Sequence, residues 1–172
     1  MPPILGEFIE KAAPMPGTAR KTSDVIADNF GAIWPVHVAA FTRLLTQLRT
    51  WFDGDLDLLL VLAVIADRTR EDRWADELLD YRDLILGTGE DEPQSPINIQ
   101  SVSDYTRIPR ETVRRKVTTL VAKGWVMRRE DGSLAVRKDA ASALEGATRD
   151  TIAYLSTLHE AFEAVRRGPG NP

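Results

Sequence analysis

The chain has 172 residues, of which 43% are apolar and 28% are charged, a balance typical of globular rather than disordered proteins. Its longest apolar stretch, Leu58 to Ala66, is nine residues, about half of what a bilayer span requires. Cysteine is absent, which excludes disulfides, thiol nucleophiles and Cys-ligated metal sites. The first residues lack the basic start and apolar core of a signal peptide, so a cytoplasmic location is expected.

The net charge of −4 hides a strong asymmetry along the chain. Residues 53–92 contain 13 acidic and 4 basic residues, a balance of −9, whereas residues 105–138 contain 3 acidic and 10 basic residues, a balance of +7. A local basic face, rather than the total charge, sets the electrostatic attraction of a protein to DNA. Residues 105–138 are therefore the candidate nucleic-acid segment.

The N-terminal half is predicted to be helical after an irregular arm at residues 1–22. Apolar spacing predicts a short helix from Ser23, a break near Gly31 to Pro35, where proline disfavours helix, and a helix that ends at Phe52. Asp55 is a good N-cap for an apolar, core-forming helix that starts at Leu56. An amphipathic helix is expected at 71–86 and a surface loop at 87–96, which completes a unit of N-terminal helices at residues 23–96.

Residues 97–138 are predicted to form a separate unit of two helices and a hairpin. A helix over Ile97–Tyr105 with Asn98 as N-cap is followed by a turn at residues 107–109 and a second helix, Arg110–Ala122. The buried positions expected for the second helix are Val113, Val117, Leu120 and Val121. Gly124 is a helix stop, and Asp131-Gly132 between alternating apolar residues is a strong hairpin signal.

A long final helix is expected from Asp139 to about Arg167, before a short tail at residues 168–172. Its apolar residues recur with the 3, 4 spacing of a coiled-coil seam, which starts at Thr148 and Thr151. The seam can pack on the helix that ends at Phe52 in the same chain or in a second chain, and we expect a homodimer. The interface residues predicted are Leu155, Leu158, Phe162 and Val165.

The order of helix, tight turn, helix and hairpin resembles the DNA-binding unit of bacterial winged helix-turn-helix transcription regulators. The segment PRETVRRKV is similar to the recognition helix of the catabolite-activator family, whereas helices on both sides of the unit are closer to the MarR-type plan. The resemblance implies a mostly α fold with a small β-hairpin wing, flanked by N- and C-terminal dimerisation helices. Arg107 departs from the pattern, because the turn position it occupies usually holds glycine. A left-handed residue there would cost about 1 kcal/mol.

The resemblance also predicts how the unit would contact duplex DNA. The exposed N-terminal face of the second helix would read base edges in the major groove through Arg110, Glu111, Arg114 and Arg115. Contacts to the phosphate backbone are expected from residues in both helices and in the wing, whose basic residues also suit the minor groove. These residues are Ser101, Ser103, Thr112, Lys116, Thr119, Arg128, Arg129, Arg137 and Lys138.

Other functions remain as alternatives. A basic winged unit can instead act as a protein–protein adaptor that binds an acidic partner. Trp34, Trp51, Trp74 and Tyr154 either line a pocket for a small-molecule effector or belong to the core. His37 and His159 are expected at an interface or the surface, and no metal site, cofactor or catalytic residue is predicted. None of the phosphate-binding, zinc-protease or hydrolase motifs occurs, so an enzyme is not expected.

Overall fold

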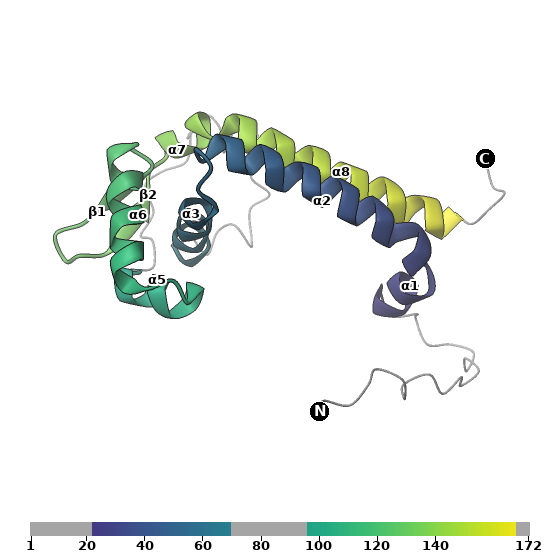
Figure 1. The fold of residues 1–172 in the computed structure, drawn as a ribbon, viewed down its shortest axis with the longest axis horizontal. Coiled ribbons are helices and arrows are strands. Elements are labelled where there is room, and N and C mark those ends of the chain that lie inside the picture. Colours follow the sequence, from purple (N-terminus) through teal and green to yellow (C-terminus); the bar gives the residue numbers. More distant parts are fainter. Residues whose placement is uncertain (1–21, 70–95, 168–172) are drawn as a thin grey trace, which may run out of the picture.

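The computed structural model describes residues 22–69 and 96–167, which form a helical body and a two-helix arm (Figure 1). The arm consists of two long helices side by side, α2 (Phe30–Trp51) and α8 (Glu145–Arg167), with α1 (Thr22–Asp28) at its far end. The elements of the body are α3 (Leu56–Arg68), α5 (Ile99–Thr106), α6 (Arg110–Ala122), β1 (Val126–Arg128), β2 (Leu134–Val136) and α7 (Asp139–Ala143). The described chain is thus mostly helical with one small antiparallel sheet, as the sequence predicts.

The core of the body is built around α3, which confirms the prediction that this apolar helix is central. Val61 and Ile65 of α3 are fully buried, and they belong to one cluster with Val102 of α5, Leu120 of α6 and Leu134 of β2. Each element of the body therefore contributes apolar surface to the same core, which orients α6 relative to the hairpin.

Three predicted helix-end signals act as expected. The Asp55 side chain accepts a hydrogen bond from the Leu58 N–H at 3.0 Å, and the Asn98 side chain accepts one from the Ser101 N–H at 3.0 Å. Both satisfy N–H groups that a helix start leaves without intrahelical partners. At the end of α6, Gly124 adopts a φ of 73°, a conformation that costs other residues steric strain.

The predicted hairpin is present, and its loop is longer than the two residues Asp131-Gly132. Strands β1 and β2 pair with Arg128 opposite Leu134, which leaves residues 129–133 as the loop. The Asp131 carboxylate accepts hydrogen bonds from the N–H and the hydroxyl of Ser133, at 2.8 and 2.7 Å. These bonds lower the pKa of Asp131 and close the loop.

The predicted break in the first long helix is wrong in position. The chain breaks at Asn29, whose side-chain amide donates to the Val25 carbonyl at 2.9 Å, and α2 then continues through Pro35. Proline deprives only the carbonyl four residues earlier of its donor. That carbonyl belongs to Gly31, an exposed residue in the first turn, where water can replace the missing N–H.

Two predictions for individual residues in the body are also wrong. Ile97 was expected to be the first residue of a helix, but it is extended and buried, and its carbonyl accepts a hydrogen bond from the Leu134 N–H at 2.7 Å. Val121 was expected in the core, but it is 42% exposed. It lies at the edge of the stripe formed by Val113, Val117 and Leu120, which are buried as predicted.

The C-terminal helix is divided rather than continuous. Leu144 leaves helical geometry, with φ −105° and ψ 13°, and separates α7 from α8. Its half-buried side chain packs against the core of the body, while α8 runs along α2. Burial of Leu144 thus accounts for a division that helical periodicity alone did not indicate. The irregular arm at 1–22, the helix at 71–86, the loop at 87–96 and the tail at 168–172 lie wholly or largely outside the described residues.

Candidate nucleic-acid interface

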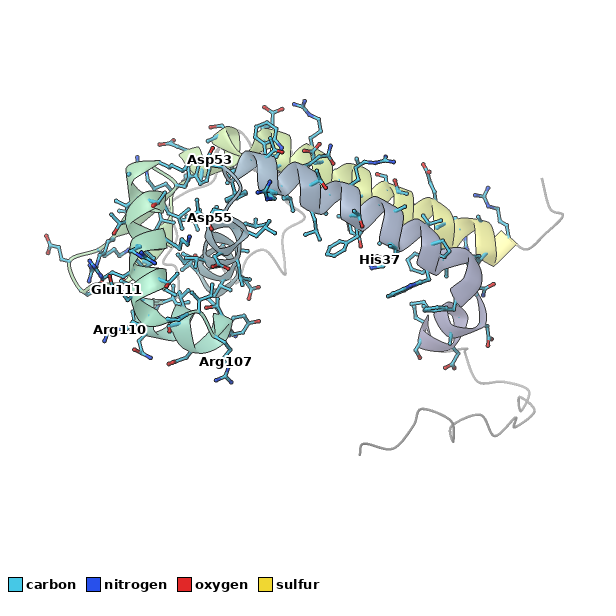
Figure 2. All side chains as sticks on the ribbon, viewed as in Figure 1. His37, Asp53, Asp55, Arg107, Arg110 and Glu111 are labelled. Carbon is cyan, nitrogen blue, oxygen red and sulfur yellow. The ribbon has the colours of Figure 1, made fainter. Side chains whose placement is uncertain are left out.

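The exposed side of α6 carries the four residues predicted to read bases. Val113, Val117 and Leu120 bury the opposite side against the core. The remaining face at the start of the helix is therefore turned to solvent, and Figure 2 shows Arg110 and Glu111 on that outer side. All four predicted residues are exposed, namely Arg110, Glu111, Arg114 and Arg115.

Two of these residues form an ion pair with each other. The Arg114 guanidinium donates from Nε and Nη2 to the two carboxylate oxygens of Glu111, at 2.9 and 2.6 Å. The hydrogen bond lowers the pKa of Glu111 and raises that of Arg114. Arg110 and Arg115 have no carboxylate partner within ion-pair distance among residues 22–69 and 96–167. Arg115 still contributes to the lowered pKa of Glu111 through its charge, but neither Arg110 nor Arg115 is held in a direct ion pair with a described carboxylate.

The hairpin extends the positively charged surface beside α6. Arg128 of β1 lines a shallow depression of about 350 Å³ together with Ile99, Arg110, Glu111 and Arg114. Residues from α5, α6 and β1 therefore meet at one surface. Of the other basic residues predicted in the wing, Arg129 is half-buried, Arg137 is exposed and 3.2 Å from Asp139, and Lys138 is exposed.

The connection between α5 and α6 is tight and uses a left-handed arginine. Arg107 has φ 61° and ψ 12°, so the position that usually holds glycine does adopt the costly conformation. Two hydroxyls support the turn: Ser103 donates to the Ile108 carbonyl at 2.8 Å, and Thr106 accepts from the Ile108 N–H at 3.2 Å. Ser103, predicted to bind phosphate, therefore already has an intramolecular acceptor.

The other hydroxyls predicted to contact the backbone differ in exposure. Ser101 is exposed in the first turn of α5, and Thr112 is half-buried at the start of α6. Thr119 is exposed, and its hydroxyl donates to the Arg115 carbonyl at 3.2 Å. Of the three, Ser101 is thus the exposed hydroxyl at the N-terminal end of a helix, and it lies 3.4 Å from the Asn98 side-chain oxygen.

Lys116 points away from the exposed face of α6 and toward α3. Its ammonium is paired with the Asp55 carboxylate, and its side chain is only 21% exposed. Burial raises the pKa of Asp55, but hydrogen bonds from Lys116 and the Leu58 N–H lower it more, so the net shift is downward. A second lysine pairs with the segment between α2 and α3, since the Lys123 ammonium lies 2.8 Å from the Asp53 carboxylate. The sequence pattern predicted the capping role of Asp55 but indicated neither of these two ion pairs.

The arm contains the residues predicted for dimerisation, and most of them are half-buried within one chain. Leu158, Phe162 and Val165 are half-buried on α8, which runs along α2 of the same chain. Leu155 is 55% exposed. Two arrangements were predicted for this helix, and the structure shows the one in which it packs on the N-terminal helix of the same chain.

The aromatic residues suggested for an effector pocket do not converge. The Trp51 indole N–H donates to Asp150 at 2.8 Å at the last residue of α2, whereas Trp34 is in the second turn of the same helix. Tyr154 is connected to Trp34 only through His37, which stands 3.0 Å from the Tyr154 hydroxyl. Trp74 lies outside the described residues.

Comparison with protein-family models, with curated proteins and with solved structures yields no match to this chain. No helix within residues 22–69 and 96–167 is long and apolar enough to cross a membrane. The same residues contain no group of three or more His, Asp or Glu side chains arranged to hold a metal ion.

Proposed function

We propose that the protein is a transcription regulator that binds duplex DNA with sequence specificity through a winged helix-turn-helix. In this proposal α6 enters the major groove and the hairpin contacts the backbone or the minor groove, and the protein acts as a homodimer in the cytoplasm without enzymatic activity. The MarR-like resemblance of the sequence is consistent with it.

The observation that carries the proposal is the common surface of the α6 N-terminus and the hairpin. Arg110, Arg114 and Arg128 line one depression, and Arg115 is exposed on the same helix. An α-helix fits the major groove of B-DNA, and arginine can donate two hydrogen bonds to guanine O6 and N7. Because Arg114 is paired with Glu111, we assign the primary base contacts to Arg110 and Arg115 and a positioning role to Arg114.

The proposal is tested by selecting bound sequences from a random duplex pool with the purified full chain at two salt concentrations. We expect a two-fold symmetric site, with affinity that falls steeply as salt rises, because phosphate contacts release counterions. Failure to enrich any sequence at low salt would refute specific DNA reading and would favour the adaptor.

Three matched arginine variants then locate the contact. Arg115→Ala should weaken the selected site by about 1–3 kcal/mol and change random DNA little, since only a base contact distinguishes sequences. Arg128→Ala should weaken all duplexes alike and lower the slope of log K against log salt by about 0.9. Arg43→Ala, exposed on the arm, is the control and should change neither quantity. Equal effects of the three substitutions would contradict the assignment.

A further inference from the structure

Helix α2 of the arm has two seams of mainly apolar residues, and α8 covers mainly one of them. The covered seam follows the spacing Ile33, His37, Leu44, Gln47 and Trp51. Ile33 and Leu44 are buried, and the other three residues contact Tyr154, Asp150 or Gly146 of α8. A helix that packs against a single partner needs only one such seam. The second seam therefore needs its own explanation.

The second seam, here named the apolar ridge, is at least 36% exposed at every residue, and its Phe41 ring also contacts α8, at 5.9 Å from the Tyr154 ring. It consists of Phe30, Trp34, Val38, Phe41 and Leu45, which are 50, 49, 45, 39 and 36% exposed. Their spacing of 4, 4, 3 and 4 matches the knob positions of a helix that packs against a further helix. Four aromatic rings in and beside the ridge form two stacked pairs. The Phe30 and Trp34 rings are 5.0 Å apart, and the His37 and Phe41 rings are 5.4 Å apart.

Exposed apolar residues of α8 continue the ridge across the arm. Asp150 contacts Gln47 and marks one edge of the α2–α8 contact. Leu155 comes about 140° around the helix from Asp150, and Leu45 about 160° from Gln47. In an antiparallel helix pair, Leu155 and Leu45 therefore both lie at the edge of the α2–α8 contact opposite to Asp150 and Gln47. Leu155 is 55% exposed, so the ridge widens into a face formed by both helices.

The size of this face suits self-association. A large aromatic side chain has an area of about 150–250 Å². The measured exposures then give roughly 400 Å² of apolar surface for the ridge, and about 500 Å² with Leu155. Two such faces approach about 1,000 Å² before any rim is counted, which reaches the range of specific interfaces. Such a patch is as large as the largest apolar patch on a typical monomer, about 300–600 Å², and patches of that kind are often functional.

We infer that the apolar ridge binds the ridge of a second copy of this chain, so that two arms close into a four-helix bundle. An antiparallel helix pair with one bare apolar face is half of such a bundle, and a two-fold interface requires only one patch that is complementary to itself. The five ridge residues carry no charge. Of the two charged residues of α2, Arg43 lies on the side away from the ridge, and Arg49 follows Leu45 by four residues, at the end of the ridge that adjoins the body. The inference rests on the proposed function, which includes a homodimer. It assigns the main contact between the two copies to α2 and not to the residues predicted on α8.

The test is sedimentation equilibrium of the full chain without DNA. We expect wild type at about twice the 19.2 kDa mass of one chain. Val38→Glu with Leu45→Glu should raise the dimer dissociation constant about a hundredfold or more, because an unpaired carboxylate in an apolar interface is strongly disfavoured. The matched control, Ala39→Glu with Thr46→Glu, adds the same charge to the opposite, exposed side of α2 and should remain dimeric.

Each outcome decides the inference. A monomeric wild type would overturn it and would assign the face to another partner. A ridge variant that stays dimeric, or a control that dissociates equally, would show that another surface holds the dimer. Far-UV circular dichroism establishes that both variants keep their helices. Since no DNA is present, a dimer that fails to select any sequence would count against the proposed function and not against the ridge.

Discussion

The pairing of Asp55 with Lys116 predicts different costs for two substitutions at one position. Asp55 both caps α3 and pairs with a lysine that is 21% exposed. Asp55→Asn keeps an oxygen for the cap and loses the charge, so we expect the free energy of unfolding to fall by about 1 kcal/mol. Asp55→Ala loses both interactions and should cost about 2 kcal/mol. For a chain of this length each kcal/mol lowers Tm by about 2–4 °C.

Thermal and urea denaturation at pH 7 would measure both losses, and a double-mutant cycle with Lys116→Met would isolate the pair. Since the folded protein lowers the pKa of Asp55 below its ordinary 3.8, the charge contributes fully above that pH and is lost as the pH falls below it. The difference between wild type and Asp55→Asn should therefore shrink toward pH 3. A zero coupling energy, or a difference that is the same at pH 3 and pH 7, would refute this reasoning.

Four further substitutions test the arm, the turn and α6. A Cβ at Gly146 would overlap the Trp51 ring, so Gly146→Ala should cost about 1–3 kcal/mol. Gly31→Ala, with no atom within 4 Å of the added Cβ, should gain up to about 1 kcal/mol in the same denaturation assay. Arg107→Gly should raise stability by about 1 kcal/mol, because glycine accepts a φ of 61° without strain; an unchanged Tm would contradict this. Lys116→Met should leave the salt slope of DNA binding unchanged, whereas a phosphate contact would lower it by about 0.9.

Local signals in the sequence predicted most elements of the body. The caps Asp55 and Asn98, the stop at Gly124 and the hairpin at Asp131-Gly132 each depend on groups only a few residues apart. Such interactions can be identified without knowing the tertiary fold. The predictions failed where distant partners decide the conformation. Ile97 is extended because it bonds to Leu134, a partner 37 positions later in the numbering.

The candidate site shows the same division between local and distant determinants. Helical periodicity correctly predicted the exposed face of α6, because Val113, Val117 and Leu120 determine which side is buried. It could not predict that Lys116 turns to α3, since its partner, Asp55, precedes it by 61 positions. Long-range ion pairs leave no periodic signal in either segment. The basic charge of residues 105–138 therefore overstates the number of cations that the exposed face of α6 and the hairpin present.

The segment that joins the arm to the body also bears on how two recognition helices would be spaced. Asp53 and Gly54 have φ of 54° and 85°, and the Gly54 N–H donates to the Arg49 carbonyl at 2.7 Å, which ends α2 abruptly. The same few residues pair with Lys116 of α6 and with Lys123, the residue that follows the helix. The orientation of α6 relative to the arm is thus fixed by short contacts rather than by a long linker. In the proposed dimer the distance between the two copies of α6 would follow from how the arms pair, so a change in the ridge contact would alter the half-site spacing that the protein selects.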